Sequence, residues 1–394
     1  MRAGRLPGRL LMPASLSLLL ACAAAGAGAA SQAPVEAHAL HAPQTVAGGD
    51  GVRRLYYELD IANFYADTGT LKLTEAAVYA DRDTKPLATF SGAALASLLR
   101  PNKELEADNS LAIAGGAHGL LLIAVPLPDG RKPPHTLRHK LTFKTAKGEL
   151  QTADDIAVTV DARPAVVLSP PLRGGLWLVD EGPGHAQSHH WGSVIAQNGR
   201  LTIPQRYAID FFGLDAQGHA VRTPVEKLAE SRVEDWPGWN SDVVAVADGV
   251  VRDTRDGLAD HKPLSPQKEP VELSARTLYG NFVVLEVQPG VFVHYAHLRQ
   301  DSVQVKPGQH VKRGALLGRL GLTGAAGAPH LHFHVSDQAS FADSQGLPFV
   351  FDSYTPAGHS SESEALNNTS AIKLAPQAPK LRRRMPLDGD IVGF

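Results

Sequence analysis

The sequence predicts an all-β protein with an immunoglobulin-like sandwich in its amino-terminal half and a second antiparallel β domain after it. Three observations lead there. Short runs such as Leu55–Ile61 alternate apolar and polar residues, which is the period of a half-buried strand. Turn signals such as Pro128-Asp129-Gly130 separate these runs at hairpin spacing. The 37 glycines and 28 prolines also favour strands joined by turns over long helices.

Composition excludes several classes of protein. The net charge of −2 provides no basic surface for nucleic acid. A single cysteine excludes an internal disulfide, and with it the small disulfide-stapled scaffolds. The 394 residues are enough for two or three domains with substantial cores.

Residues 1–30 have the pattern of a secretory signal. Three arginines precede an apolar run from Leu10 to Ala21, and small residues continue to Ala30. The run is short and contains Pro13, which argues against a permanent membrane span. We therefore expect export to the periplasm or cell envelope.

Two processing routes remain open for this segment. Cys22 follows Leu19-Leu20-Ala21, which resembles a bacterial lipobox, so the protein could carry a lipid anchor at Cys22. Alternatively, cleavage near Ala29 or Ala30 would remove the cysteine with the signal.

The mature chain is expected to begin with a disordered linker over residues 31–50, which are rich in Ala, Pro, Gly and His. Residues 51–165 predict the immunoglobulin-like sandwich, because hairpin-spaced strands continue over about a hundred residues. Leu120–Val125 is apolar throughout and predicts a buried strand, and Gly92–Leu99 a short helix.

Residues 166–340 predict the second β domain. Strands are expected at Gln205–Phe212 and on both sides of the Asp248-Gly249 turn, and a hairpin around Gln288-Pro289-Gly290. Residues 341–394 are mostly polar and irregular, and we interpret them as an extended carboxy-terminal tail.

The chemistry of the chain centres on Pro329–Val335. His330, His332 and His334 alternate strictly with apolar residues, so three imidazoles should line one face of a strand. Same-face neighbours lie roughly 6.5–7 Å apart, so two adjacent histidines can converge on one ion or one water, whereas the third is too far. Imidazole is both a common metal ligand and the side chain that titrates near neutrality.

Two further segments carry candidate ligands. Asp210 is the only acid in the apolar strand Gln205–Phe212, and a carboxylate in such surroundings needs a cation, a metal or several donors. A loop just upstream contains His185, His189 and His190 within six residues.

Four motifs in this order resemble the M23 family of zinc metallopeptidases, the lysostaphin- or LytM-like cell-wall endopeptidases. They are Tyr207–Asp210, Ala247–Val251, Tyr295–Leu298 and Gly324–Val335. The resemblance covers about residues 185–340 and implies an antiparallel sheet with Zn2+ at the floor of a groove. It further implies that Asp210 and His332 bind the zinc and that His297 and His330 are the catalytic histidines beside a water.

The sequence departs from the family at the first zinc ligand. The family usually has a histidine four residues before the aspartate, where this chain has Arg206, and an arginine cannot donate a lone pair to a metal. Either His189 or His190 replaces the missing imidazole, or the metal site is degenerate. The sequence does not decide between the two histidines.

The resemblance implies an exported zinc metallopeptidase that hydrolyses peptide cross-links of bacterial peptidoglycan with a zinc-activated water. Trp191, Trp236 or Trp239 could line its groove, or they could be core residues. The alternative is a degenerate, non-catalytic LytM-like module that binds or activates another cell-wall hydrolase. The succession of turns and short strands in Val305–Gly321 also resembles a lipoyl hairpin. It lacks, however, the modifiable lysine between apolar flanks at a hairpin tip.

Overall fold

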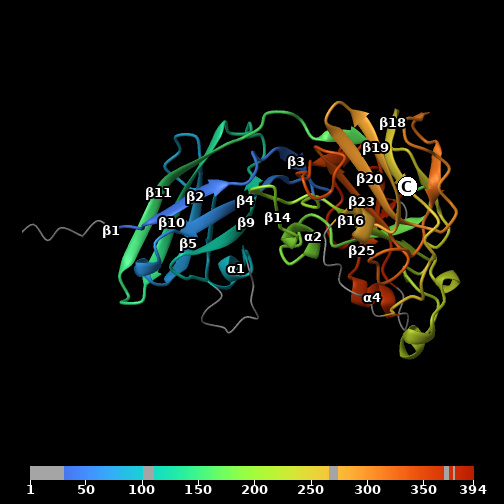
Figure 1. The fold of residues 1–394 in the computed structure, drawn as a ribbon, viewed down its shortest axis with the longest axis horizontal. Helices are drawn as coiled ribbons and strands as arrows, with labels where there is room; N and C mark the ends of the chain where they lie inside the picture. Colours follow the sequence, from blue (N-terminus) through green and yellow to red (C-terminus); the bar gives the residue numbers. More distant parts are fainter. Residues whose placement is uncertain (1–30, 101–110, 266–273, 368–371, 376–377) are drawn as a thin grey trace, which may run out of the picture.

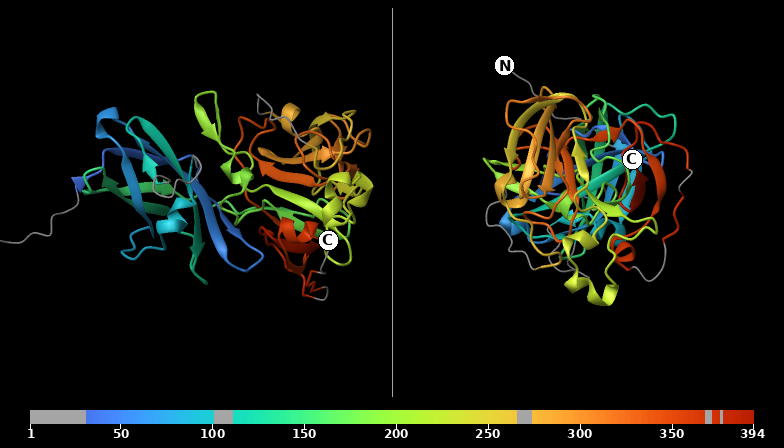
Figure 2. Two further views of the ribbon diagram at one scale, coloured as in Figure 1. Left: turned by 90° about the horizontal axis from the view of Figure 1, so that it is seen from below. Right: turned by 90° about the vertical axis from the view of Figure 1, so that its right-hand side faces the viewer.

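The computed structural model describes residues 31–100, 111–265, 274–367, 372–375 and 378–394 of the chain. The predicted secretory signal, including Cys22, Ala29 and Ala30, lies outside this part. Figure 1 shows two β lobes side by side along the long axis, and a second view agrees (Figure 2). The all-β prediction is confirmed, because strands dominate and the helices are short. Among the described residues, no helix has the length and apolarity to cross a membrane.

The amino-terminal lobe is a sandwich of two sheets around one apolar core. One sheet has the order β1 (Ser31–Gln32), β11 (Leu150–Thr159), β10 (Thr136–Thr145), β5 (Leu71–Ala80) and β6 (Ala88–Ser91), with β8 (Ala112–Ile113) on β5. The other has the order β2 (Val35–Ala39), β4 (Arg53–Asn63), β9 (Ala117–Leu127) and β7 (Leu99–Arg100), with β3 (Thr45–Ala47) on β4. Short helices η1 (Ala66–Thr68) and α1 (Gly92–Ala96) join strands.

The predicted disordered linker over residues 31–50 is wrong. Strands β1, β2 and β3 lie there, and β2 and β3 pair antiparallel with β4. Ala33 and Val46 are buried in the lobe. Backbone pairing with a long neighbouring strand orders a segment whose own side chains give little pattern.

Strands β4 and β9 are buried on both faces. Leu121 and Ile123 of β9 point into the sandwich core, whereas Leu120 and Leu122 join the main core of the second lobe. This explains why the sequence of β9 is apolar without alternation, as predicted for a buried strand. The two lobes therefore share a continuous apolar interface.

The second lobe is built on a long antiparallel sheet. Within the described residues its order is β21 (His310–Val311), β18 (Gly249–Arg255), β19 (Asn281–Gln288), β20 (Val291–Leu298), β23 (Leu331–Ser336), β16 (Ile209–Leu214), β13 (Leu176–Asp180), β26 (Asp390–Gly393) and β25 (Thr355–His359). Small pairs flank it: β12 (Val166–Leu168) with β24 (Phe349–Phe351), β14 (Ile195–Gln197) with β15 (Arg200–Thr202), and β17 (Asp242–Val244) with β22 (Leu316–Arg319). The remaining helices are α2 (His189–Gly192), η2 (Val225–Glu230), η3 (Val233–Asp235), α3 (Ala275–Leu278) and α4 (Glu362–Leu366).

The predicted extended tail over residues 341–394 is wrong where it forms strands β24, β25 and β26 and helix α4. Strand β26 pairs with β13 and with β25, which extends the main sheet, and Ile391 and Val392 are fully buried. These strands are too short and too poor in apolar residues to show a period in the sequence, so tertiary packing decides their structure.

Candidate metal and catalytic site

The candidate site lies where four neighbouring strands bring their polar side chains together. In the register of the sheet, Asp210 of β16 is opposite His332 of β23, and His332 is opposite Ala296 of β20. Asp180 of β13 is opposite Asp210 on the other side. Residues opposite one another point to the same face of a sheet, so this pairing alone places the carboxylate beside the imidazole. The face opens into a cavity of about 530 Å3.

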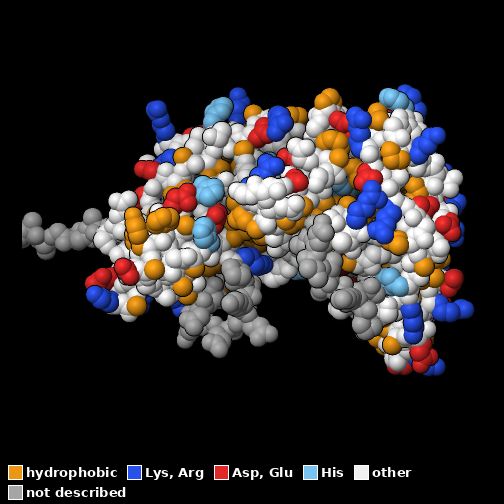
Figure 3. Space-filling view, in the orientation of Figure 1, with side chains coloured by type: hydrophobic (Ala, Val, Ile, Leu, Met, Phe, Trp, Pro, Cys, Tyr) orange, Lys and Arg blue, Asp and Glu red, His pale blue; other side chains and the backbone are white. Residues whose placement is uncertain are grey.

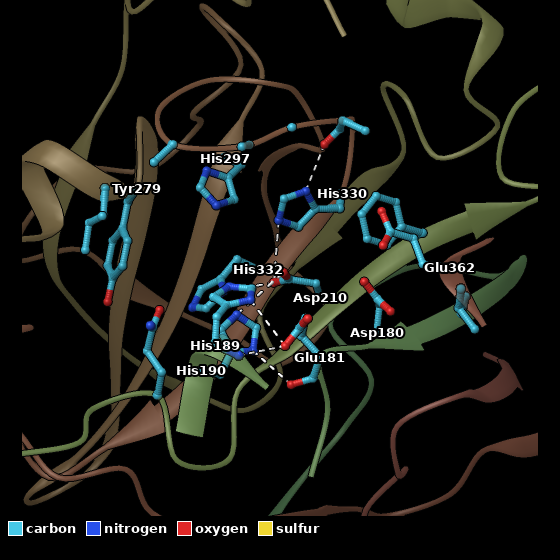
Figure 4. Close-up of a pocket in the computed structure, with 18 of the residues that line it drawn as sticks. Asp180, Glu181, His189, His190, Asp210, Tyr279, His297, His330, His332 and Glu362 are labelled. Atoms are coloured by element: carbon cyan, nitrogen blue, oxygen red, sulfur yellow. Dashed lines mark hydrogen bonds and ion pairs between the residues drawn. The ribbon is translucent and has the colours of Figure 1, made fainter. Parts of the chain in front are cut away.

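The structure brings all the predicted site residues to this cavity (Figure 4). Nδ1 of His332 lies 2.9 Å from Oδ1 of Asp210, and Nε2 of His190 lies 3.5 Å from Oδ2. Nε2 of His330 is 3.5 Å from Oδ1 of the same carboxylate. The ring of His297 lies 4.7 Å from that of His330 and 5.9 Å from that of His332, between centroids.

His189 and His190 differ in their surroundings. The side chain of His189 is 63% exposed, and its Nδ1 is 3.2 Å from the Glu181 carboxylate. Its ring lies 4.2 Å from that of His190, between centroids. His190 is only 2% exposed, and its ring packs edge-on against that of His332. Its Nδ1–H donates to the carbonyl of Glu181 at 3.0 Å, so Nε2 carries the lone pair and faces Asp210.

Burial and charge set the protonation of this cluster. Burial lowers the pKa of His190 to about 3, so its ring is neutral. Burial opposes the charge on His189, but the bond from Glu181 raises its pKa. Burial alone would raise the pKa of Asp210, but the charge of His330 and the nearby imidazoles hold it well below its ordinary value. The site therefore holds an ionised carboxylate beside neutral His190.

His297 enters the cavity from a strained position. Strand β20 carries one extra residue opposite β19 here, because Tyr295 faces Val283 whereas Leu298 faces Asn281. His297 has a φ of 63°, in the left-handed region that ordinary residues rarely adopt. Such a bulge re-aims a side chain, and such strain clusters at functional sites. The Nδ1–H of His297 donates to the carbonyl of Thr323 at 2.8 Å, which leaves the lone pair on Nε2.

A buried chain of hydrogen bonds, which the sequence did not predict, runs behind His332. Its members in order are His332, His334, Tyr279, His294, Ser336 and the Gln338 carbonyl. The Ser336 hydroxyl donates to that carbonyl at 2.8 Å, so it accepts from Nε2–H of His294 at 2.8 Å. Burial lowers the pKa of both His294 and His334, so these two rings are neutral. Continuing back along the chain, Nε2–H of His332 donates to Nδ1 of His334 at 3.0 Å.

This direction leaves Nδ1 of His332 facing Asp210, with Oδ1 2.9 Å away. A proton on Nδ1, or a metal cation bound by both atoms, would join the imidazole to the carboxylate. The third histidine of the alternating motif, His334, bonds to His332 from behind.

The donor set fits a zinc ion. The ligand atoms of His189, His190 and Asp210 lie within 4.8 Å of one another, and Nδ1 of His332 adjoins the carboxylate. Two imidazoles, one carboxylate and an open fourth position form the usual ligand set of catalytic zinc. The cavity beside them supplies the open position.

Arg206 points away from the cluster. Its side chain is fully buried against Glu58 of β4, with Nη2 2.7 Å from Oε2 and Nε 2.8 Å from Oε1. The position that holds a histidine in the resembled family therefore serves the contact between the two lobes. No sequence pattern indicates this partner, because Glu58 occupies the polar face of an alternating strand.

The tryptophans divide between core and cavity. Trp191 and Trp236 are both nearly fully buried, and of the three predicted candidates only Trp236 lines the cavity. Acidic side chains also line the cavity. Burial and neighbouring carboxylates, Glu362 first, raise the pKa of Asp180 to about 7. Neither these acidic residues nor Tyr279 had a recognisable pattern in the sequence.

Residues 237–344 match the family model described as Peptidase family M23. This domain belongs to peptidase family M23. The match includes His297, His330 and His332 but begins after Asp210, so it leaves out the variant part of the site. A stretch of 56 residues is 45% identical to the peptidoglycan DD-endopeptidase ShyB of Vibrio cholerae. That stretch covers 14% of this chain and only 13% of the relative.

Solved structures of M23 peptidases are also similar to the chain. The catalytic domain of lysostaphin from Staphylococcus simulans is 20% identical, covers 44% of this chain and 88% of its own, and has a TM-score of 0.23. A zinc-containing peptidase from Vibrio cholerae is 16% identical, covers 77% of this chain and 83% of its own, and has a TM-score of 0.24. These scores are too low to add to the family match.

Proposed function

We propose that this M23 protein is a zinc metallopeptidase that hydrolyses peptide cross-links of bacterial peptidoglycan. The observation that carries the proposal is the convergence of Nδ1 of His332 and Nε2 of His190 on the Asp210 carboxylate, at 2.9 and 3.5 Å. A metal cation bound at this point would have two nitrogens and an oxygen as ligands. The substrate rests on the family match and on the printed name of the Vibrio cholerae relative.

We assign the ligands to His190, Asp210 and His332, with His189 as the second candidate for the first position. His190 is favoured because it is buried, neutral and directed at Asp210, whereas His189 is exposed and bound to Glu181. When bound there, zinc acts as a Lewis acid that polarises a carbonyl group and acidifies water at its open position.

His297 and His330 are the groups that move protons in this proposal. Each donates Nδ1–H to a backbone carbonyl, to Thr323 and Ala328 respectively, at 2.8 Å. These bonds fix both rings and leave Nε2 as the nitrogen that takes or gives a proton. With the rings 4.7 Å apart, one can accept a proton while the other stabilises a developing oxyanion.

The alternative is a non-catalytic module that binds or activates another cell-wall hydrolase, and Arg206 at the first ligand position is the observation that favours it. Purified peptidoglycan, incubated with the full chain before and after chelator treatment, separates the two. Release of soluble peptides that stops with chelator, returns with zinc and is lost in His297→Ala and His330→Ala supports the peptidase. Zinc-free protein without hydrolysis would support the alternative.

Three further assignments belong to the same proposal. The amino-terminal sandwich is immunoglobulin-like, and the chain is exported to the cell envelope by residues 1–30, with Cys22 as a possible lipid anchor. The partner is a peptidoglycan peptide and not nucleic acid. Acidic and basic side chains are interspersed on the face that Figure 3 shows.

A further inference from the structure

Glu58 stands on the face of β4 that leaves the sandwich. Its neighbours on either side, Tyr57 and Leu59, point into the sandwich core, whereas Glu58 is completely buried against the second lobe. A carboxylate in such a place needs strong partners. Those partners all belong to the lobe that contains the metal site.

The Glu58 carboxylate binds two side chains of the second lobe, Trp191 on α2 and Arg206 just before β16. Its Oε1 accepts from the indole Nε1–H of Trp191 at 2.5 Å and from Nε of Arg206 at 2.8 Å, and its Oε2 accepts from Nη2 of Arg206 at 2.7 Å. Arg206 also donates to the side chain of Gln345 and the carbonyl of Gly346. Short bonds to a charged group, made without water, are the strong and geometrically specific kind.

Trp191 directly follows His190 on α2, which has only four residues. A helix of one turn has almost no stability of its own, so external contacts decide its orientation. The ring of Trp191 packs edge-on against that of Tyr56, also on β4, with centroids 5.5 Å apart. Figure 1 shows α2 where the two lobes meet.

On this basis we propose that Glu58 is a positioning residue for the metal site, so that the sandwich helps to form the first-ligand position from outside the peptidase domain. Glu58 binds Trp191, which orients α2 and with it His190 toward Asp210. The same carboxylate neutralises the Arg206 guanidinium and holds its side chain against β4, away from the metal site. This inference rests on the proposed assignment of His190 as a ligand.

The experiment measures metal binding by the full chain, with zinc in competition with a chromophoric chelator and with Co2+ absorption as a report on coordination. Trp191→Phe removes the indole N–H but keeps an aromatic ring and the Glu58–Arg206 pair. We expect about tenfold weaker zinc binding and an altered Co2+ spectrum, since outer partners of metal ligands typically contribute tenfold or more. Glu58→Gln should shift both readouts in the same direction.

Tyr57→Phe is the matched control. It removes a buried hydroxyl from the adjacent residue of β4, where Tyr57 bonds to His139 inside the sandwich, 2.7 Å away. A general weakening of the sandwich would affect this variant equally, whereas the proposal predicts zinc affinity within about twofold of the wild type.

The outcomes separate this inference from the proposed function. If the wild type binds zinc and Trp191→Phe binds it with unchanged affinity and spectrum, Glu58 does not position the site, although the metal assignment stands. Equal losses in Trp191→Phe and Tyr57→Phe would also overturn the inference. If the wild type binds no zinc, the proposed function fails and this inference fails with it. If Glu58→Gln does not fold, Trp191→Phe decides the test alone, because it keeps the buried Glu58–Arg206 pair.

Discussion

Nε2 of His190 lies 3.5 Å from Oδ2 of Asp210, although the two residues come from separate elements twenty positions apart. The short helix α2 supplies the imidazole nitrogen and the strand β16 supplies the carboxylate oxygen. The resembled family usually has a histidine four residues before the aspartate, where this chain has Arg206. In the proposed site, His190 on a neighbouring helix supplies the nitrogen instead.

The ion pair between Glu58 and Arg206 leads to the first prediction. Arg206→Met should lower the free energy of unfolding by about 3–5 kcal/mol, because it leaves a fully buried carboxylate without its cation. The double change Glu58→Met with Arg206→Met should cost clearly less than the sum of the two single changes. Urea unfolding of the four proteins measures the coupling, and additive losses would show that the pair is not energetically linked.

Tyr279 provides the second prediction, because its hydroxyl joins His334 to His294 in the chain of bonds behind His332. Tyr279→Phe leaves one buried donor and one buried acceptor unpaired, which should cost about 1–3 kcal/mol. It also releases the constraint on the His332 tautomer, so zinc affinity should fall about tenfold.

Tyr295 on β20 is the control for Tyr279. The hydroxyl of Tyr295 accepts from the backbone of Val246 at 3.1 Å, within the apolar core, so Tyr295→Phe should lower stability without a change in zinc affinity. Titration of both variants with zinc decides the matter. Equal affinities would mean that the hydrogen-bonded chain does not influence the metal.

The third prediction concerns the acid stability of the sandwich. Burial lowers the pKa of His139 from 6.5 to about 4, and its ring is held neutral between the Ile156 carbonyl and the Tyr57 hydroxyl. The unfolded chain takes up a proton below pH 6.5, whereas the folded chain does so only near pH 4. Stability should therefore fall as the pH drops through this window, by about 3 kcal/mol from this group.

Comparison with His139→Leu isolates that contribution. The variant should be less stable than the wild type at pH 7, and the difference should shrink as the pH approaches 4. Guanidinium unfolding at several pH values provides the measurement. A difference that is constant over this range would show that His139 is not the group responsible.

The alternating strands could be predicted from the sequence, because they depend on local pattern. The alternation of His330 and His332, the isolated acid Asp210 and the resemblance to the M23 family together indicated side chains that the structure brings to one cavity. Burial of Glu58 could not be predicted, since an acid on the polar face of a strand normally meets water. It meets Arg206 only because the second lobe covers that face.

Which of His189 and His190 faces Asp210 could not be predicted from the sequence either. Adjacent residues on a single helical turn point in different directions, and which of them faces Asp210 depends on how α2 is anchored. The terminal strands β2, β3 and β26 were missed for a related reason: neighbouring strands, not their own residues, determine their structure.

Zinc content of purified variants tests the central assignment most directly. We expect about one zinc per chain in the wild type and in His189→Ala, and almost none in His190→Ala after dialysis, because His190 is buried with Nε2 3.5 Å from Asp210, whereas His189 is exposed and lies against Glu181. Circular dichroism should show that both variants remain folded. Full zinc content in His190→Ala, with loss in His189→Ala or in neither variant, would contradict the account.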